Sequence, residues 1–249
     1  MTGKARKRVT CLRVGWPLLL LLGLLLPNRA RTQVQWEVVE SNLLNTDIRY
    51  TSFSTGTAPT ATIYFTDGAK LLAEGYDEEL QRLTELDSLP AARYVFVSTL
   101  DSTGTDRRND YFFCIPDYLR FFTEELLPAV EGTNPLDPAN RYLVGVSFGG
   151  LNAAYFASQG APFAGYGLLS PITYPRRREL AKHIAFGPRT GQRFFISTGR
   201  YDAEVYVEEL LAFYGRREFA VRAHYVAGGH EFGTWLGQLG VGLRYLLLN

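Results

Sequence analysis

Short apolar runs alternate with helical patterns along most of this chain, and this alternation restricts the available folds more than any other feature. Each run is five or six residues long and carries little polar alternation, which is typical of strands buried on both faces of a parallel sheet. The predicted strands are Ala61–Phe65, Tyr94–Ser98, Tyr142–Val146, Ala164–Leu169, Arg193–Ser197 and Val221–Val226.

Helical patterns fill the gaps between these strands. They cover Asp77–Leu86, Pro116–Val130, Leu151–Ser158, Arg176–Ile184, Val205–Phe213 and a last segment around 232–247. Upstream, Trp36–Ser54 reads as two extended segments joined by a turn near Asn45. The order predicts one α/β domain over residues 31–249, with a mostly parallel central sheet and helices on both faces. Ligands of such sheets bind at the carboxyl ends of the strands.

A glycine-flanked serine follows one of the predicted strands. Residues 145–150 read G-V-S-F-G-G, with an apolar strand before them and the small-residue helix Leu151–Ser158 after them. This strand–turn–helix context is what a nucleophile elbow requires. Gly145 and Gly149 leave room where strand and helix pass closely, and the helix N-terminus favours negative charge beside the hydroxyl. The pattern therefore indicates Ser147 as the nucleophile of an α/β-hydrolase fold.

A serine hydroxyl needs a base, and in this fold the acid and then the histidine follow the serine along the chain. His230 comes after the last predicted strand, in a loop that begins with two glycines. The acid should follow the preceding strand, where Asp202 is the first choice and Glu204 the alternative. Either carboxylate could hold the imidazole tautomer and stabilise imidazolium.

Acyl transfer also needs N–H donors that face the developing oxyanion. One expected donor is the amide of Phe148, directly after the nucleophile. The other should come from the loop that follows Ala61–Phe65, where Gly68 permits a close backbone approach. Ala69 is the expected second donor, with Gly68 as the alternative.

The N-terminal segment differs from the rest of the chain. It has five basic residues before an apolar run of 14 residues, from Val14 to Pro27, and no acidic residue. This layout predicts a signal peptide over residues 1–30 and export to the periplasm or medium. The run is shorter than the roughly 20 residues that span a bilayer. The alternative is an uncleaved membrane anchor at residues 14–27, which would be the chain's one membrane contact.

Charge and composition exclude several classes of function. Cleavage after Ala30 would remove six basic residues and no acidic one, which takes the formal net charge from +1 to −5. A mildly acidic domain gives no electrostatic case for nucleic-acid binding. With three histidines and no metal-ligand spacing, we expect no metal or other cofactor. Only Cys114 would remain after cleavage, so no intramolecular disulfide is expected.

These residues resemble a known family, the enterochelin esterases and their esterase D-type relatives. Tyr64–Gly68 is similar to the family's strand and D-G loop, Phe121–Pro128 to the helix before its elbow strand, and Gly229–His230 with Trp235 to its G-H…W ending. The resemblance extends from about Trp36 onward. The family also contains feruloyl and acetyl-xylan esterases, S-formylglutathione hydrolase and mycolyl transferases. It therefore implies fold and triad more strongly than substrate.

Two details of the resemblance bear on substrate and location. Enterochelin esterases typically carry an arginine upstream of that helix, and Arg107 or Arg108 lies in the comparable region, although a solvated charge run fits these residues equally. The chain looks more like the shorter, exported members than the cytoplasmic enzymes with an extra N-terminal domain. The expected substrate is a siderophore-type or other small ester.

Two rival functions stay open at this stage. An acyl transferase would use the same triad with an alcohol acceptor in place of water. A binding protein on a hydrolase fold would be expected to have lost Ser147 or His230, and both are present. The sequence pattern does not predict an oligomeric state.

Overall fold

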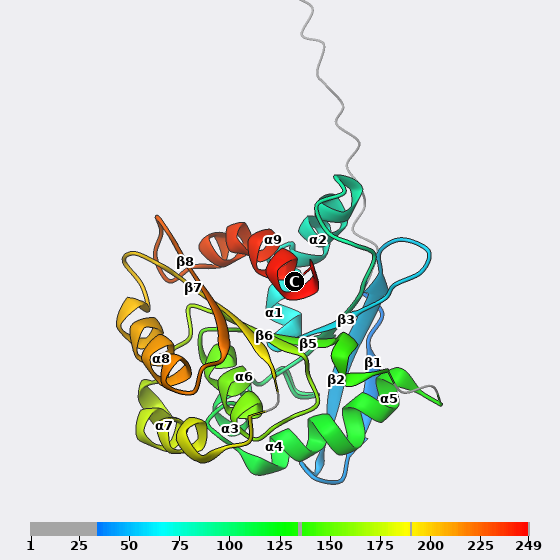
Figure 1. The fold of residues 1–249 in the computed structure, drawn as a ribbon. Helices are drawn as coiled ribbons and strands as arrows, with labels where there is room; N and C mark the ends of the chain where they lie inside the picture. Colours follow the sequence, from blue (N-terminus) through cyan, green and yellow to red (C-terminus); the bar gives the residue numbers. More distant parts are fainter. Residues whose placement is uncertain (1–33, 134–135, 190, 249) are drawn as a thin grey trace, which may run out of the picture. The chain divides into compact units, whose positions relative to one another are not determined.

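The computed structural model describes residues 34–133, 136–189 and 191–248 (Figure 1). The predicted signal peptide at residues 1–30 and the alternative anchor at residues 14–27 lie outside the described residues. From Val34 onward the chain forms one compact unit. In the part of the chain that the structure describes, no helix is both long enough and apolar enough to cross a membrane.

The described residues build an eight-stranded sheet in the order β1-β2-β4-β3-β5-β6-β7-β8. β1 and β2 are antiparallel to their neighbours, whereas β4, β3 and β5–β8 run parallel to one another. This confirms the predicted mostly parallel sheet. The strands are β1 (Glu37–Ser41), β2 (Thr46–Ser54), β3 (Thr62–Phe65), β4 (Arg93–Val97), β5 (Arg141–Val146), β6 (Gly165–Leu169), β7 (Arg193–Gly199) and β8 (Ala220–Val226).

Helices cover both faces of the sheet (Figure 1). One face carries α1 (Gly68–Ala73), α2 (Tyr76–Glu85) and α9 (Phe232–Leu248). The other carries α3 (Arg108–Tyr111), α4 (Pro116–Arg120), α5 (Leu127–Glu131), α6 (Phe148–Ser158), α7 (Arg177–Phe186) and α8 (Glu204–Arg216). Short 3₁₀ turns at Pro138–Asn140 and Tyr174–Arg176 precede β5 and α7.

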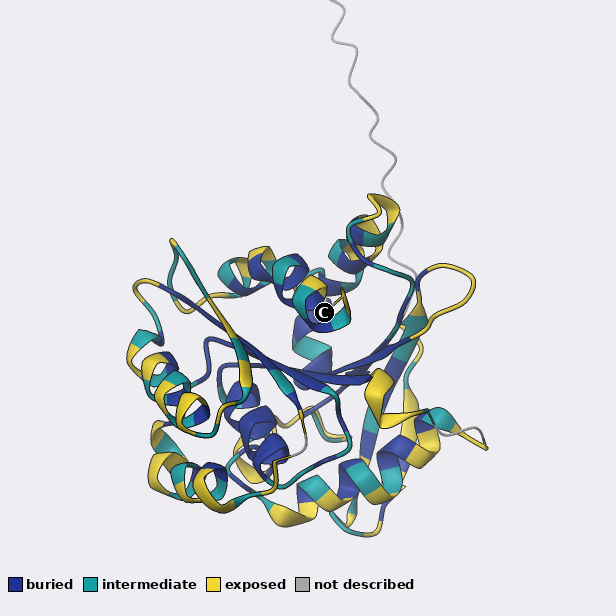
Figure 2. Ribbon diagram, viewed as in Figure 1, coloured by how far each residue is buried: buried dark blue, intermediate teal, exposed yellow. Residues whose placement is uncertain are grey.

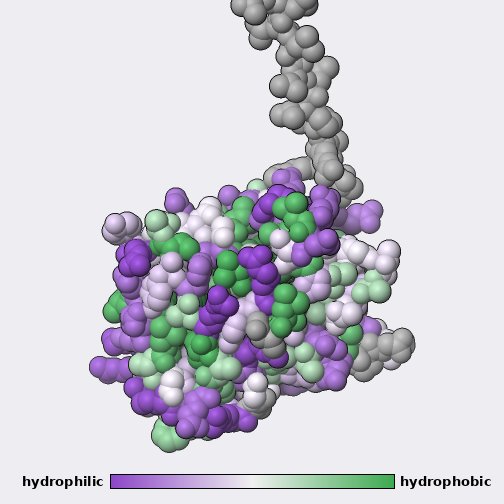
Figure 3. All heavy atoms as spheres, turned by 45° about the horizontal axis from the view of Figure 1, so that its top comes forward, coloured by the Kyte–Doolittle hydropathy of each residue, from purple (hydrophilic) through white to green (hydrophobic). Residues whose placement is uncertain are grey.

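Burial follows the position of each strand in the sheet (Figure 2). Every residue of β3, β5 and β6 is buried, as the apolar runs predicted for strands covered on both faces. β8 lies at one edge, and all of its residues are exposed or half-buried. Elsewhere on the surface, the face in Figure 3 shows apolar residues as separate small groups among hydrophilic ones.

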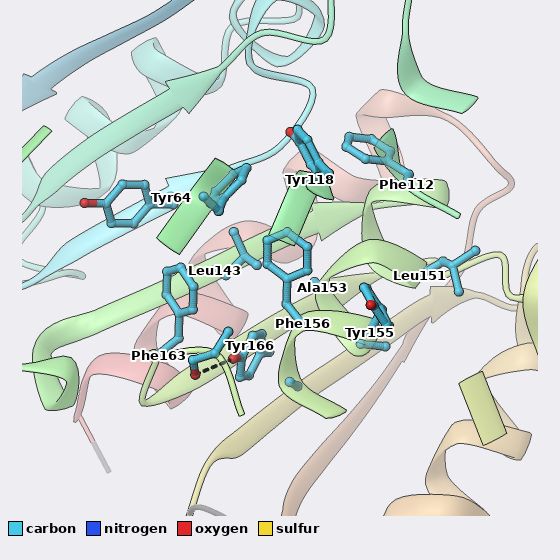
Figure 4. Close-up of a cluster of buried hydrophobic side chains, with 14 of the residues drawn as sticks. Tyr64, Phe112, Tyr118, Leu143, Leu151, Ala153, Tyr155, Phe156, Phe163 and Tyr166 are labelled. Atoms are coloured by element: carbon cyan, nitrogen blue, oxygen red, sulfur yellow. Dashed lines mark hydrogen bonds between the residues drawn. The ribbon is translucent and has the colours of Figure 1, made fainter. Parts of the chain in front are cut away.

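Two apolar clusters fill the space between the sheet and its helices. The cluster beneath α4–α8 is rich in aromatic rings, and Figure 4 shows several of them packed together. The Phe122 ring centroid lies 5.2 Å from those of Tyr118 and Phe156. Such contacts join α4 and its continuation to α6, and so hold the helix that carries the elbow against the sheet.

The helices differ from the sequence prediction in two places. The predicted helix Pro116–Val130 contains a π-helical turn at Phe121–Leu126, between α4 and α5. Pro128 lies in the first turn of α5, and a proline both lacks an N–H and crowds the carbonyl four residues earlier, which favours a wider turn there. The short helices α1 and α3 were missed, because six and four residues are too few to show a period.

Candidate active site

Ser147 lies on a sharp turn between β5 and α6. Its backbone has φ 57° and ψ −118°, a conformation that costs an L-residue on the order of 1–3 kcal/mol. The residue is buried, with 6% of its surface exposed. This is the elbow geometry that the G-x-S-x-G pattern predicted, and the strain holds the hydroxyl out at the carboxyl end of the sheet.

The glycines around Ser147 are required by close backbone contacts. A Cβ atom on Gly145 would lie 2.0 Å from the carbonyl oxygen of Gly149. One on Gly149 would lie 2.5 Å from Thr66 Oγ1, and one on Gly150 would lie 2.9 Å from Pro171 Cβ. Strand, helix and the β3–α1 connection therefore meet too closely at the elbow for any side chain.

The imidazole of His230 lies between the serine and a carboxylate. His230 Nε2 is 2.9 Å from Ser147 Oγ, and Nδ1 is 2.5 Å from Asp202 Oδ1. With Nδ1 protonated toward the carboxylate, Nε2 can accept the serine proton. The Asp202 side chain is 2% exposed and that of His230 is 38% exposed. Of the two carboxylates considered from sequence, the structure brings Asp202 to the imidazole, while Glu204 begins α8.

The loops of the acid and the base pack closely at the Gly228 carbonyl oxygen. This oxygen accepts a hydrogen bond from the Tyr201 amide (3.3 Å), and it lies so near Gly199 that a Cβ atom there would be 2.3 Å away. The buried ring of Trp235 packs edge-on against the imidazole, with centroids 4.8 Å apart. Sequence reasoning noted Trp235 only through the family ending and did not assign it this contact.

The two amides expected at the oxyanion hole lie after neighbouring strands, β3 and β5. In α6 the backbone bonds to Ser147 O begin with the amides of Gly150 and Leu151, so the amide of Phe148 has no acceptor inside the helix. Asp67 O accepts from Lys70 and Leu71 in the same way. This leaves the earlier amides, those of Gly68 and Ala69, without a helical acceptor. The expected loop thus ends at Asp67, where α1 begins.

A cavity of about 320 Å³ opens beside Ser147 and His230. Its walls are mostly apolar and include Leu71, Val146, Phe232 and Trp235. Two cations also line it, and each already has a carboxylate partner. Lys70 Nζ lies 2.6 Å from Asp106 Oδ2, and Arg108 Nε lies 2.6 Å from Asp67 Oδ1.

Of the two arginines in the charge run, one lies on the surface and one lies at the candidate site. Arg107 is exposed and pairs with Asp110 at 2.8 Å, whereas Arg108 lines the cavity. Its buried partner Asp67 was not identified from the sequence, although it stands beside Gly68. Burial raises the pKa of the Asp67 carboxyl to about 6, against the opposing effect of the nearby Arg108.

Metal ligands do not gather in the described part of the chain, where no group of three or more His, Cys, Asp or Glu residues could hold an ion. The other two histidines have their contacts elsewhere and not with Ser147 or Asp202. His183 is within hydrogen-bond distance of Gln159 (3.0 Å), and His224 packs against Phe195. Cys114 is buried and free.

The sheet order, the elbow and the serine–histidine–aspartate geometry together define an α/β hydrolase with a serine site. The family model described as "Putative esterase" matches residues 41–246, which is most of the chain. The chain therefore belongs to this esterase family.

Solved structures share this fold. The enterobactin esterase of Shigella flexneri superposes with a TM-score of 0.73 at 24% identity, over 87% of this chain and 59% of that one. An IroE-like serine hydrolase from Shewanella oneidensis gives 0.70 at 19% identity, over 86% of this chain and 79% of that one. A ferulic acid esterase gives 0.70 at 17% identity, over 86% and 97%. The present chain thus spans about 59% of the length of the enterobactin esterase that it matches. Among curated proteins, none matches this chain.

Proposed function

We propose that this protein hydrolyses small carboxylic esters through an acyl-enzyme on Ser147. The observation that carries the proposal is the continuous contact from Ser147 Oγ to His230 Nε2 (2.9 Å) and from His230 Nδ1 to Asp202 (2.5 Å). Nucleophile, base and orienting acid come from three loops far apart in sequence. Their meeting at hydrogen-bond distance is the geometry that serine acyl transfer requires.

Each half-reaction moves one proton through His230. Ser147 Oγ attacks the ester carbonyl carbon as its proton passes to Nε2, and the amides of Phe148 and Ala69 stabilise the oxyanion. Nε2 then protonates the departing alcohol oxygen, which leaves the acyl group on Ser147. A water molecule next attacks the acyl carbon and gives its proton to Nε2. Return of this proton to Ser147 Oγ releases the carboxylic acid and restores the free serine.

Asp202 serves this cycle without taking the proton. Its carboxylate accepts from Nδ1–H, which leaves Nε2 free to act as the base and stabilises the imidazolium that forms twice per turnover. Its near-complete burial strengthens this interaction, because little water competes for the carboxylate. Glu204, the alternative acid, starts α8 and is not among its buried residues, so its carboxylate would lack this shielding.

The cavity favours an uncharged, largely apolar acyl group. Phe232 and Trp235 offer aromatic walls beside the histidine. Lys70 and Arg108 contribute no free positive charge, since Asp106 and Asp67 neutralise them. The neighbouring structures carry names that refer to enterobactin, to 2,3-dihydroxy-N-benzoyl-serine and to ferulic acid. We therefore propose small esters with an aromatic acyl group as substrates, siderophore-type esters among them.

Export is part of the same proposal. The basic and then apolar composition of residues 1–30 supports a cleaved signal peptide and a periplasmic or secreted enzyme. Sequencing the N-terminus of the protein recovered from its native host tests this. A mature chain that starts near residue 31 is the expected result, a membrane-bound chain that retains residues 14–27 indicates the anchor, and a cytoplasmic chain from Met1 contradicts export.

A fluorophosphonate probe tests the nucleophile directly. Native protein should take up one equivalent, mapped by mass spectrometry to Ser147, and the Ser147→Ala variant should take up none. Turnover should then be measured on p-nitrophenyl acetate, feruloyl esters and catecholate siderophore esters, with and without added alcohols. Release of free acid supports the esterase, whereas transfer to the alcohol in preference to water indicates the acyl transferase. Labelling elsewhere contradicts the proposal.

A further inference from the structure

An ion pair between the buried Asp67 and the half-buried Arg108 of α3 lies beside the two loops on which the proposed oxyanion hole depends. The Asp67 side chain is 3% exposed and precedes Gly68 and Ala69, and Arg108 Nε lies 2.6 Å from its Oδ1. The same guanidinium donates through a terminal nitrogen to the carbonyl oxygen of Val146 (3.3 Å). Arg108 thus links the residue that begins α1 to the residue that directly precedes the nucleophile.

Arg108 also packs against the aromatic ring of the residue that follows Ser147, and against a ring near its own helix. Its Cζ atom lies 5.5 Å from the ring centroid of Phe148 and 5.6 Å from that of Phe112. A guanidinium at this distance from an aromatic ring is attracted to it. The side chain of the proposed oxyanion donor Phe148 is therefore held by the same cation that holds Asp67.

The Asp67 carboxylate also abuts the elbow helix directly. A Cβ atom on Gly149 would lie 3.2 Å from Asp67 Oδ2, and this oxygen is buried without a hydrogen-bond partner among the described residues. The backbone of Asp67 is left-handed at φ 61°, and its carbonyl oxygen starts the hydrogen bonds of α1. A strained, desolvated residue in this position costs stability, which suggests a role other than stability.

We infer that Asp67 and Arg108 form a positioning pair that holds the amides of Ala69 and Phe148 at the spacing the oxyanion needs. The inference rests on the proposed function, since it concerns how the same reaction is stabilised. Neither side chain has to touch the oxyanion. The pair acts through the backbone of the two loops. Asp67 fixes the start of α1, and Arg108 contacts Val146 and Phe148, the residues on both sides of the nucleophile.

Steady-state kinetics on a neutral substrate separate positioning from substrate binding. With p-nitrophenyl acetate, Asp67→Asn and Arg108→Gln should each lower kcat by about 10²-fold, the effect expected when an oxyanion donor is lost or moved. KM should change less than about threefold. Arg107→Gln is the matched control, because Arg107 is exposed and pairs with Asp110 on the surface. It should retain native kcat and KM.

Inhibitor binding gives a readout that loss of stability alone would not change. A trifluoromethyl ketone places an oxyanion on Ser147, so its affinity should fall in both variants by about the factor lost in kcat. Arg108→Lys keeps the charge but cannot contact Asp67 and Val146 together, so it should lose activity as well. Arg108→Lys also serves as the test if circular dichroism shows that Asp67→Asn or Arg108→Gln does not fold.

Different results would overturn different statements. Raised KM with native kcat would make Arg108 a substrate-binding residue, and native kinetics in all three site variants would deny the pair any role. Either result overturns the inference and leaves the esterase proposal intact as long as the fluorophosphonate labels Ser147 of the native protein. A native protein that is not labelled at Ser147 overturns both.

Discussion

At the scale of single residues, the candidate site contains two aspartates whose side chains are buried in different surroundings. Asp202 lies against the imidazole and Asp67 against a guanidinium. Both side chains are almost fully shielded from water, which strengthens the interaction of Asp202 with His230 and that of Asp67 with Arg108. A change to asparagine keeps the shape of each and removes the charge, which makes the two positions directly comparable.

The first expected outcome concerns the acid of the triad. Asp202→Asn should lower kcat on the order of 10⁴-fold, because an amide favours the wrong imidazole tautomer and leaves imidazolium unstabilised. Glu204→Gln should stay near native activity, since this side chain starts α8 and the described residues give it no bond to His230. kcat for both variants decides, with circular dichroism as the folding control. A dead Glu204→Gln with an active Asp202→Asn would reverse the assignment.

The second outcome concerns Asp67 and pH. Its folded-state pKa of about 6 lies above the ordinary aspartate value of 3.8, mainly because burial disfavours the charged form. The stability linked to its protonation is therefore complete below about pH 4 and lost as pH rises through 6. Asn cannot ionise, so the stability of Asp67→Asn relative to native should increase by about 3 kcal/mol between pH 4 and pH 7.

Denaturant unfolding at pH 4 and pH 7 measures the free energy of unfolding of both proteins. A difference between Asp67→Asn and native that is the same at both pH values would contradict the prediction. The control is Asp110→Asn, which removes an exposed carboxylate and should show no such slope. The charged and titratable groups that face Asp67 are Arg108 on α3, Lys70 on α1, Asp106 in the preceding loop, Tyr76 on α2 and Tyr118 on α4. Both tyrosines have pKa values raised by burial and stay neutral over this range.

At the scale of elements, the sequence patterns predicted what depends on local order and missed what depends on packing. β5 and α6 could be predicted because the apolar run, the glycines and the small-residue helix lie together in the chain. α3 could not, because its four residues show no period and read as a charge run. Its place beside the elbow comes from contacts of Arg108 with residues distant in sequence.

The third outcome tests the close packing at the elbow. Gly145→Ala should abolish activity and destabilise the protein by several kcal/mol, since the new Cβ would lie 2.0 Å from a backbone oxygen that cannot move away alone. Gly215→Ala in α8 is the control, because no atom other than those of the neighbouring residues and backbone of its own helix lies within 4 Å of the added Cβ. It should be neutral or stabilising by up to about 1 kcal/mol. Thermal melts with activity assays measure both, and a folded, active Gly145→Ala would contradict the elbow.

At the scale of the whole molecule, the sheet assembles a site whose parts are far apart in the chain. The loops after β3, β5, β7 and β8 supply Asp67, Ser147, Asp202 and His230. Chain order and the elbow pattern singled out Ser147, Asp202 and His230, and the structure places these three side chains at hydrogen-bond distance. The cavity walls and the pairing of Arg108 were not predictable, because they depend on how α1, α3 and α9 pack on the sheet.

The fourth outcome follows from the unequal burial of the strands that carry the triad. Ser147 follows β5, whose residues are all buried, whereas His230 follows β8, an edge strand with no fully buried residue. Edge segments with little buried surface open at lower free energy than the core. Activity should therefore be lost at a lower urea concentration than the cooperative loss of far-ultraviolet dichroism. Coincident transitions would show that β8 opens only with the whole sheet.

The same difference in burial between β5 and β8 predicts a reversible inactive state of the proposed enzyme. Local opening of β8 would move His230 away while Ser147 stays in its strained turn. Ser147 would then lose its base before the rest of the fold unfolds. Hydrogen exchange should then be fast for the amides of β8 and slow for those of β5, within a single molecule and at full activity. A serine that is inert whenever its base is absent is protected from stray acylation, and restoring a seven-residue strand is enough to make it reactive again.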